Sequence, residues 1–228
     1  MPKALVEIGA QPILWHVIEI YARQGFNRFL LCTGYLGEMI EEFVAGCEWP
    51  KGVEIECVDT GLDTPTGGRI ARIADRLEAG PFCVTYADGV ADVDLDALLT
   101  FHRAEGTLAT ITVVRPTMQW GLAEIDGTDR IRRFVEKPRS EHWVNGGFIC
   151  FEPGALAYFE EDSVLERGPL ERLATEGELT AYRHSGFWDC MDTYKDAVVL
   201  NDLWRAGDAP WLPDGSAGLA TPAERTAS

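Results

Sequence analysis

Hydrophobic residues recur along the first half of the chain with two alternating spacings. Residues 12–24 (PILWHVIEIYARQ) are apolar at helical spacing, with a proline in front and Gly25 behind, the start and stop signals of a helix. The shorter segments between such helices are continuous or alternating apolar runs, which predict strands. The predicted helices span 12–24, 37–44, 66–77 and 95–103, and the predicted strands span 28–33, 53–58, 81–86 and 108–114.

This order of elements predicts the fold class. Repeated exchange of strand and helix is typical of an α/β protein with a Rossmann-like, mostly parallel sheet, whose ligands bind outside the carboxyl ends of the strands. The second half has strand-like segments at 121–125, 131–135 and 147–151 and helix-like segments at 153–159 and 192–204, which predict a small α+β addition. We expect one domain over residues 1–212 and a flexible tail over 213–228, where apolar residues are few.

Charge and composition narrow the function classes. The chain has 228 residues, with 20 basic and 37 acidic side chains and a net charge of −17. A protein that neutralises nucleic-acid phosphates needs a basic face, so this balance argues against a nucleic-acid partner. No apolar run reaches the roughly 18 residues of a membrane-spanning helix. Six scattered cysteines and the absence of a secretory signal favour a reducing, cytoplasmic location.

Two acidic loops are candidates for chemistry. In YADGVADVD, Asp88 follows a predicted buried strand, where a carboxylate suits a hard cation, and Asp94 is placed to cap the next helix. In GFWDCMDTYKD, Asp192 precedes a predicted helix. It either completes a metal site with Asp88 or caps that helix, and the sequence leaves both interpretations open.

Other segments give weaker signals. In TGLDTPTGGRI, Gly67 and Gly68 either let the backbone approach a ligand or begin an ordinary helix. Lys137 in VEKP is one of four lysines against 16 arginines, and a lysine is a compact charge suited to a phosphate. The segment that begins with Asn145 suits hydroxyl recognition as well as a simple turn. His16 lies within an apolar helix and is expected to be packed rather than catalytic.

Taken in order, these segments resemble the sugar-nucleotide pyrophosphorylases, and within them the glucose-1-phosphate cytidylyltransferases. The resemblance is carried by PKALVEIGAQPILWH, LLCTGYLGEMI, VDTGLDTPTGGRI, YADGVADVDLDALLTFH, FVEKP, NGGFICF and GFWDCMDT. It implies transfer of a cytidylyl group from CTP to glucose 1-phosphate, with Mg²⁺ as cofactor and CDP-glucose and pyrophosphate as products.

The same resemblance implies roles for individual residues. Asp88 and Asp192 match the positions that hold the metal, and Lys3 matches a lysine that contacts the nucleotide phosphates. The remaining matches are Thr64, Arg69 and Ala87 for the nucleotide and Glu136, Lys137, Asn145 and Gly146 for the sugar phosphate. No protein nucleophile is implied, because a sugar phosphate oxygen attacks the nucleotide directly.

Two departures from the family pattern leave alternatives open. Family members carry a strand and a glycine-rich phosphate-binding loop ahead of the position that matches Lys3, so we expect a gap near the middle of the sheet, weakened catalysis and a fold at risk. Residues 44–58 are also shorter than the matching segment of cytidylyltransferases. A transferase that uses dTTP, UTP or GTP, a non-catalytic sugar-nucleotide-binding relative, and an unrelated α/β binding module are the alternatives, and the resemblance allows a homo-oligomer.

Overall fold

The computed structural model describes residues 1–212, and the tail predicted at 213–228 lies outside them. The α-helices are α1 (Ile13–Ala22), α2 (Gly37–Gly46), α3 (Thr66–Arg72), α4 (Leu95–Glu105), α5 (Pro169–Thr175) and α6 (Tyr194–Arg205), and the 3₁₀ helices are η1 (Lys3–Leu5), η2 (Ala74–Arg76) and η3 (Pro153–Tyr158). The strands are β1 (Glu7–Ile8), β2 (Gln11–Pro12), β3 (Arg28–Thr33), β4 (Glu54–Asp59), β5 (Phe82–Val84), β6 (Gly89–Ala91), β7 (Ala109–Val114), β8 (Leu122–Ile125), β9 (Ile131–Val135), β10 (Val144–Phe151), β11 (Leu179–Arg183) and β12 (Trp188–Cys190).

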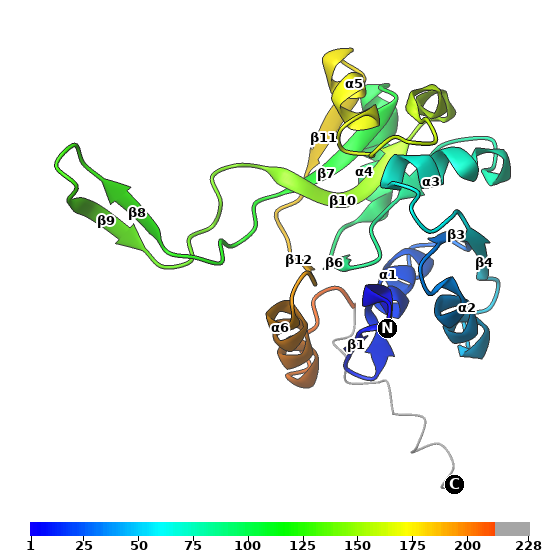
Figure 1. Cartoon of the computed structure of the whole chain (residues 1–228), viewed down its shortest axis with the longest axis horizontal. Helices are drawn as coiled ribbons and strands as arrows, with labels where there is room; N and C mark the ends of the chain where they lie inside the picture. The colour runs from blue at the N-terminus through cyan, green and yellow to red at the C-terminus, as the bar shows by residue number, and fades with distance from the viewer. Residues whose placement is uncertain (213–228) are drawn as a thin grey trace, which may run out of the picture.

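A four-stranded sheet of order β11-β7-β10-β5 forms the centre of the molecule (Figure 1). β7 pairs with β11 in parallel, and β10 runs antiparallel to both β7 and β5. β5, β7 and β11 therefore point in one direction, with β10 alone running against them. β3 and β4 form a separate parallel pair, from Arg28 opposite Glu54 to Thr33 opposite Asp59. The α/β class predicted from the sequence is confirmed.

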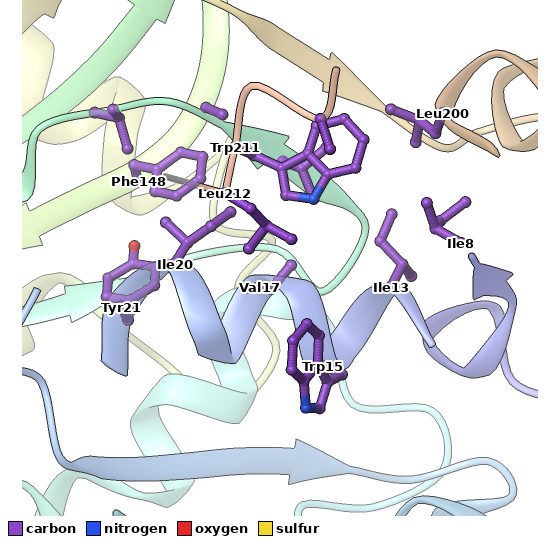
Figure 2. Packing of buried hydrophobic residues seen from close by; sticks show 14 of the residues in the cluster. Ile8, Ile13, Trp15, Val17, Ile20, Tyr21, Phe148, Leu200, Trp211 and Leu212 are labelled. Atoms are coloured by element: carbon purple, nitrogen blue, oxygen red, sulfur yellow. The ribbon is translucent and has the colours of Figure 1, made fainter. Parts of the chain in front are cut away.

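β10 divides the hydrophobic interior into two clusters. Successive side chains of a strand point to opposite faces, so Phe148 and Cys150 lie in one cluster while Ile149 and Phe151 lie in the other. The first cluster contains half of α1, a helix whose residues are all buried except Ala22. Figure 2 shows Phe148 beside Tyr21 and Trp211 above α1, so the far end of the described chain closes this core.

A cleft separates the two main sheets. It has a volume of about 630 Å³ and lies between the edges of β3 and β5, with α1 and α3 contributing to its lining. Within residues 1–212, β3 pairs only with β4 and β5 only with β10, so neither edge has a ladder partner across the cleft. Residues 81–86 were expected to be a buried strand, but Pro81 is exposed and residues 82–86 are half-buried, because the cleft borders them. The gap expected near the middle of the sheet is therefore present.

Several boundaries differ from the predicted ones for local reasons. The helix predicted over 66–77 is interrupted at Ile73, where ψ reaches 5° and the chain continues as the 3₁₀ helix η2. The segment 153–159 is also a 3₁₀ helix rather than an α-helix. α6 begins at Tyr194 because Thr193 and Asp196 form a reciprocal capping box. No helix among residues 1–212 is long and apolar enough to cross a membrane.

Candidate active site

Lys3 lies between two carboxylates that are distant in the sequence. Its Nζ is 2.6 Å from Oδ2 of Asp88 and 2.7 Å from Oδ1 of Asp192. The three side chains are partly exposed, at 42%, 28% and 67%, so a ligand in solvent can reach all of them. The structure thus brings together the three residues that the sequence assigned to the reacting centre.

Short strand pairing assembles this cluster. β12 runs antiparallel to β6, with Cys190 opposite Gly89, and the amide of Met191 donates to the carbonyl of Asp88 at 2.9 Å. Asp88 directly precedes β6 and Asp192 lies two residues after β12, so these contacts bring the two carboxylates close together. Asp192 is not the cap of α6, because Thr193 fills that position, so the helix-cap interpretation of Asp192 is wrong. Asp94 does cap α4, accepting from the amide of Ala97 at 2.8 Å.

Lys3 and Asp192 stabilise each other's charges. Hydrogen bonds from Lys3 and from Cys190 lower the pKa of Asp192 below its ordinary value. Partial burial opposes the charge on Lys3, but hydrogen bonds to Asp192 and Asp88 outweigh it and raise the pKa of the ammonium. A cation is therefore already favoured at the point where the two carboxylates converge.

The donor set also fits Mg²⁺. This ion is commonly held by one or two carboxylates and completes its shell with water and substrate phosphates. Asp88 and Asp192 supply two such oxygens, and no group of three or more His, Cys, Asp or Glu within the described part of the chain is arranged to hold a metal alone. The residues suit a metal shared with a phosphate substrate better than a closed structural site.

A second cavity of about 340 Å³ opens beside this cluster. Asp88, Asp192, Asn145 and Gly146 all contribute to its lining. β10 is irregular between Asn145 and Ile149, and the indole of Trp188 donates to the carbonyl of Gly146 at 2.7 Å. Two of the residues assigned to the sugar phosphate therefore lie next to the carboxylate pair.

The residues assigned to the nucleotide are less closely gathered. Arg69 and Ala87 line the larger cleft. The guanidinium of Arg69 donates to the carbonyl of Thr33 and to the hydroxyl of Thr60, both at 2.6 Å, which ties the ends of β3 and β4 together. Thr64 lies outside the linings of both cavities and accepts a hydrogen bond from Arg72 at 3.0 Å.

Gly67 and Gly68 serve packing within the chain. A Cβ on Gly68 would lie 2.0 Å from the carbonyl oxygen of Glu161, and one on Gly67 would lie 2.5 Å from Oγ of Ser163. The paired glycines thus let α3 approach the 161–165 segment. This contact explains them without a ligand against their backbone.

Glu136 and Lys137 do not join the cluster. Both are exposed residues that follow β9, outside the linings of the two cavities. Lys137 adopts a φ of 46°, a left-handed conformation that a non-glycine residue rarely takes. Their assignment to the sugar phosphate stays a prediction.

Sequence reasoning missed two side chains at the site. Tyr86 lines both cavities, and its hydroxyl donates to Glu166. Tyr86 precedes Asp88 in the same loop, and this position beside a candidate carboxylate could have identified it as a site residue. Glu166 lies in a segment without a recognisable motif, and only the tertiary fold brings it to Tyr86.

The arrangement is that of an enzyme acting on phosphate esters. Two carboxylates able to hold a divalent cation, an ammonium and two adjoining cavities lie where β5 ends, and such sites promote transfer at phosphorus. The chain belongs to the nucleotidyl transferase family, whose model matches residues 1–188. It is accordingly a nucleotidyltransferase.

Individual relatives agree with this family. Glucose-1-phosphate cytidylyltransferase of Salmonella typhi is 39% identical over 92% of this chain and 90% of its own length. Among solved structures, UDP-glucose pyrophosphorylase complexed with UDP-glucose has a TM-score of 0.68 at 14% identity and covers 90% of this chain and 91% of its own. HddC from Yersinia pseudotuberculosis complexed with GMP-PN has a TM-score of 0.67 at 19% identity, over 89% of each chain. The two structures support the fold.

Proposed function

We propose that this chain transfers a cytidylyl group from CTP to glucose 1-phosphate, giving CDP-glucose and pyrophosphate. The observation that carries the proposal is the contact of Lys3 with Asp88 and Asp192 beside a cavity of about 340 Å³. The choice of CTP and glucose 1-phosphate rests on the 39% identity to the Salmonella enzyme. CDP-glucose would serve nucleotide-sugar and polysaccharide synthesis.

The proposed step is an in-line displacement at phosphorus. A phosphate oxygen of the sugar phosphate forms a bond to the α-phosphorus of CTP. The bond from that phosphorus to the oxygen bridging to the β-phosphorus breaks, and pyrophosphate leaves with the electron pair. No covalent bond to the protein forms, so the residues act by aligning two anions and by stabilising charge.

Lys3, Asp88 and Asp192 would divide this work. Lys3 places a positive charge where the reacting phosphates meet, and Asp88 and Asp192 would hold Mg²⁺. When bound, Mg²⁺ neutralises negative charge on the phosphates and orients them. Lys3 contacts Oδ2 of Asp88 and Oδ1 of Asp192, so an ion held at these two atoms would displace its ammonium, which would then be free to contact the phosphates.

Pyrophosphate release tests the reaction directly. The chain is incubated with glucose 1-phosphate and Mg²⁺, and separately with CTP, UTP, dTTP, GTP or ATP. Release with CTP alone is the expected result. A preference for another nucleotide would replace CTP in the proposal, and no release with any of the five would overturn catalysis and favour a non-catalytic relative.

Substitution of the carboxylates tests the metal. Asp88→Asn and Asp192→Asn should each lower kcat by a factor on the order of 10² or more, because each removes a ligand of the charge-neutralising ion. Both should also weaken Mg²⁺ binding measured by calorimetry. Asp96→Asn, at an exposed position in the first turn of α4, is the matched control and should change neither quantity. Full activity of Asp88→Asn with unchanged Mg²⁺ binding would contradict the assignment.

We also propose that the chain forms a homo-oligomer through the β8–β9 hairpin. β8 and β9 project from the body (Figure 1), and an isolated two-stranded hairpin is marginally stable in water. Its side chains Ile125, Ile131 and Phe134 are 64%, 58% and 61% exposed. The same face of a second copy would cover them by two-fold symmetry. The cytoplasmic location expected from the sequence stays a prediction.

A further inference from the structure

A chain of hydrogen bonds runs between the two cavities of the site. It begins at Thr66, the first residue of α3, whose hydroxyl donates to Oε2 of Glu166 at 3.3 Å. The other oxygen of Glu166 accepts from the hydroxyl of Tyr86. Asn145 then donates through Nδ2 to the same Tyr86 oxygen at 3.1 Å. Thr66 lines the larger cleft and Asn145 the smaller cavity, while Tyr86 lines both.

The direction of every hydrogen bond in this chain follows from Glu166. An ionised carboxylate only accepts, and each hydroxyl has a single hydrogen to donate. Tyr86 gives its hydrogen to Glu166, so toward Asn145 its oxygen can act only as an acceptor. Burial, followed by the hydrogen bond to Glu166, raises the pKa of Tyr86, so the phenol keeps its hydrogen.

This polarity fixes the amide of Asn145. Its NH₂ group faces Tyr86, and its Oδ1 accepts from the amide of Gly147 at 2.8 Å. One N–H and one oxygen lone pair of the amide remain for a ligand. The backbone of β10 there is also unusual, with φ values of 73° at Gly147 and 48° at Phe148, and the left-handed conformation of Phe148 is strained, so the irregular part of β10 that carries Asn145 holds a defined shape.

We propose that Glu166 is a positioning residue which, acting through Tyr86, orients the Asn145 amide toward the sugar 1-phosphate. This inference rests on the proposed function, because it assigns the smaller cavity to the sugar phosphate. Glu166 makes no ion pair with any side chain of residues 1–212, so its carboxylate is not committed to a surface salt bridge. Its two oxygens instead join the start of α3 to Tyr86.

Removing the Tyr86 hydroxyl or the Glu166 carboxylate should weaken the binding of glucose 1-phosphate in the same way. Tyr86→Phe deletes the hydroxyl and keeps the ring, while Glu166→Leu removes the acceptor of the phenolic hydrogen, which is then free to turn toward Asn145. To accept that hydrogen, the amide of Asn145 has to flip, and it then loses the contact with Gly147. We expect the KM for glucose 1-phosphate to rise about ten-fold in each variant, as for one lost hydrogen bond to a charged group. The KM for CTP should change by less than about two-fold, because the defect lies on the sugar side.

The double variant separates a shared pathway from two independent effects. If Glu166 acts through Tyr86, the double variant should be no worse than the more impaired single variant, whereas independent effects would multiply. Tyr158→Phe is the matched control, because Tyr158 donates in the same way to Glu176 at 2.5 Å away from both cavities. It should leave both KM values unchanged.

Calorimetry measures the binding of glucose 1-phosphate with Mg²⁺ present and without nucleotide, so this readout does not depend on turnover. Weaker binding in Tyr86→Phe and Glu166→Leu, with thermal midpoints equal to that of Tyr158→Phe, supports the positioning role. A wild-type chain that turns over while both variants keep its KM and affinity would overturn this inference alone. A wild-type chain that neither binds nor uses glucose 1-phosphate would overturn the proposed function and this inference together.

Discussion

His16 is buried among three tryptophan rings. Its ring centroid lies 5.1 Å from those of Trp15 and Trp204 and 5.9 Å from that of Trp211. Nδ1 accepts from the indole of Trp211 at 3.2 Å, which leaves Nε2 to donate to the carbonyl of Ile8 at 2.9 Å. The neutral imidazole fits these partners and the imidazolium does not, so the expectation of a packed histidine is confirmed.

The environment of His16 predicts a loss of stability in mild acid. Burial lowers the pKa of His16 to about 4, against about 6.5 in an unfolded chain. Between these values the unfolded state binds the additional proton, so the free energy of unfolding falls as pH falls from 6.5 toward 4. The contribution of this group from pH 7 to pH 5 is about 2 kcal/mol.

Denaturant unfolding at pH 7 and pH 5 measures this loss. His16→Gln should show a smaller pH dependence than the wild type, even if it is less stable at both values. His142→Gln, at an exposed histidine, should keep the wild-type dependence. Equal pH dependence in all three proteins would show that His16 does not titrate as its burial requires.

The extent to which the site was predictable differs from residue to residue. Asp88 was identified by its position after a buried strand, and Asp192 by its position before a helix, where a cap was the alternative, whereas Lys3 was identified by resemblance alone. The contact among the three residues could not be predicted from the sequence, because Lys3 and Asp192 are 189 positions apart. Tyr86 was missed although it lies two positions before Asp88, and Glu166 was missed because neither the spacing nor the composition of its segment marks it.

The β8–β9 hairpin has two different faces. Glu124 opposes Arg133, and their side chains form an ion pair at 3.0 Å on one face. Ala123 opposes Phe134 on the other face, which also holds Ile125 opposite Ile131. Phe134 additionally packs against Gly121, where a Cβ would lie 2.4 Å from its ring. The first face also holds Leu122 opposite Val135. The second face carries Ile125, Ile131 and Phe134, three exposed apolar side chains, as expected of a surface that is covered in an assembly.

Breaking the apolar face should dissociate the assembly. A variant with Ile131→Thr and Phe134→Ser removes two exposed apolar side chains without touching the core. Light scattering coupled to gel filtration should find an oligomer for the wild type and a monomer for this variant. Glu124→Gln, on the opposite face, should keep the wild-type mass. A monomeric wild type would refute the proposed role of the hairpin.

Helices and strands with a clear hydrophobic pattern in their own sequence were predicted well. Strands that form only because they pair with another strand were not. β3 and β9 have the predicted bounds, because apolar runs between clear turn signals define them. β6 and β12 are short strands whose side chains show no period, and they exist because they pair with each other. α5 and β11 also escaped prediction, since α5 has only seven residues and β11 is largely half-buried or exposed.

At the scale of the whole molecule, the cleft between β3 and β5 weakens the interior. Leu31 on β3 is only half-buried and lines this cleft, whereas Leu98 on α4 is 1% exposed within the first core cluster. Leu98 is therefore packed on all sides, whereas Leu31 is not. Truncation of Leu31 creates little new cavity, because an open space already lies beside it.

The two leucines give a matched test of that cleft. Leu98→Ala should cost about 2 to 5 kcal/mol of the free energy of unfolding, and Leu31→Ala about 1 kcal/mol or less. Denaturant titration of both variants measures the difference. The native wild type should also enhance the fluorescence of an apolar dye, and glucose 1-phosphate should not displace it. Equal costs at the two positions would show that the cleft is closed in solution.

The pairing of β6 with β12 has a consequence for biosynthesis. The ribosome releases Lys3 first and Asp88 long before Asp192, so the reacting centre cannot assemble until nearly all of the described chain has emerged. Trp211 then seals the core around His16 later still. Catalytic competence is therefore among the last properties that a nascent chain acquires, and a synthesis product that stops before β12 has all four strands of the central sheet but lacks Asp192.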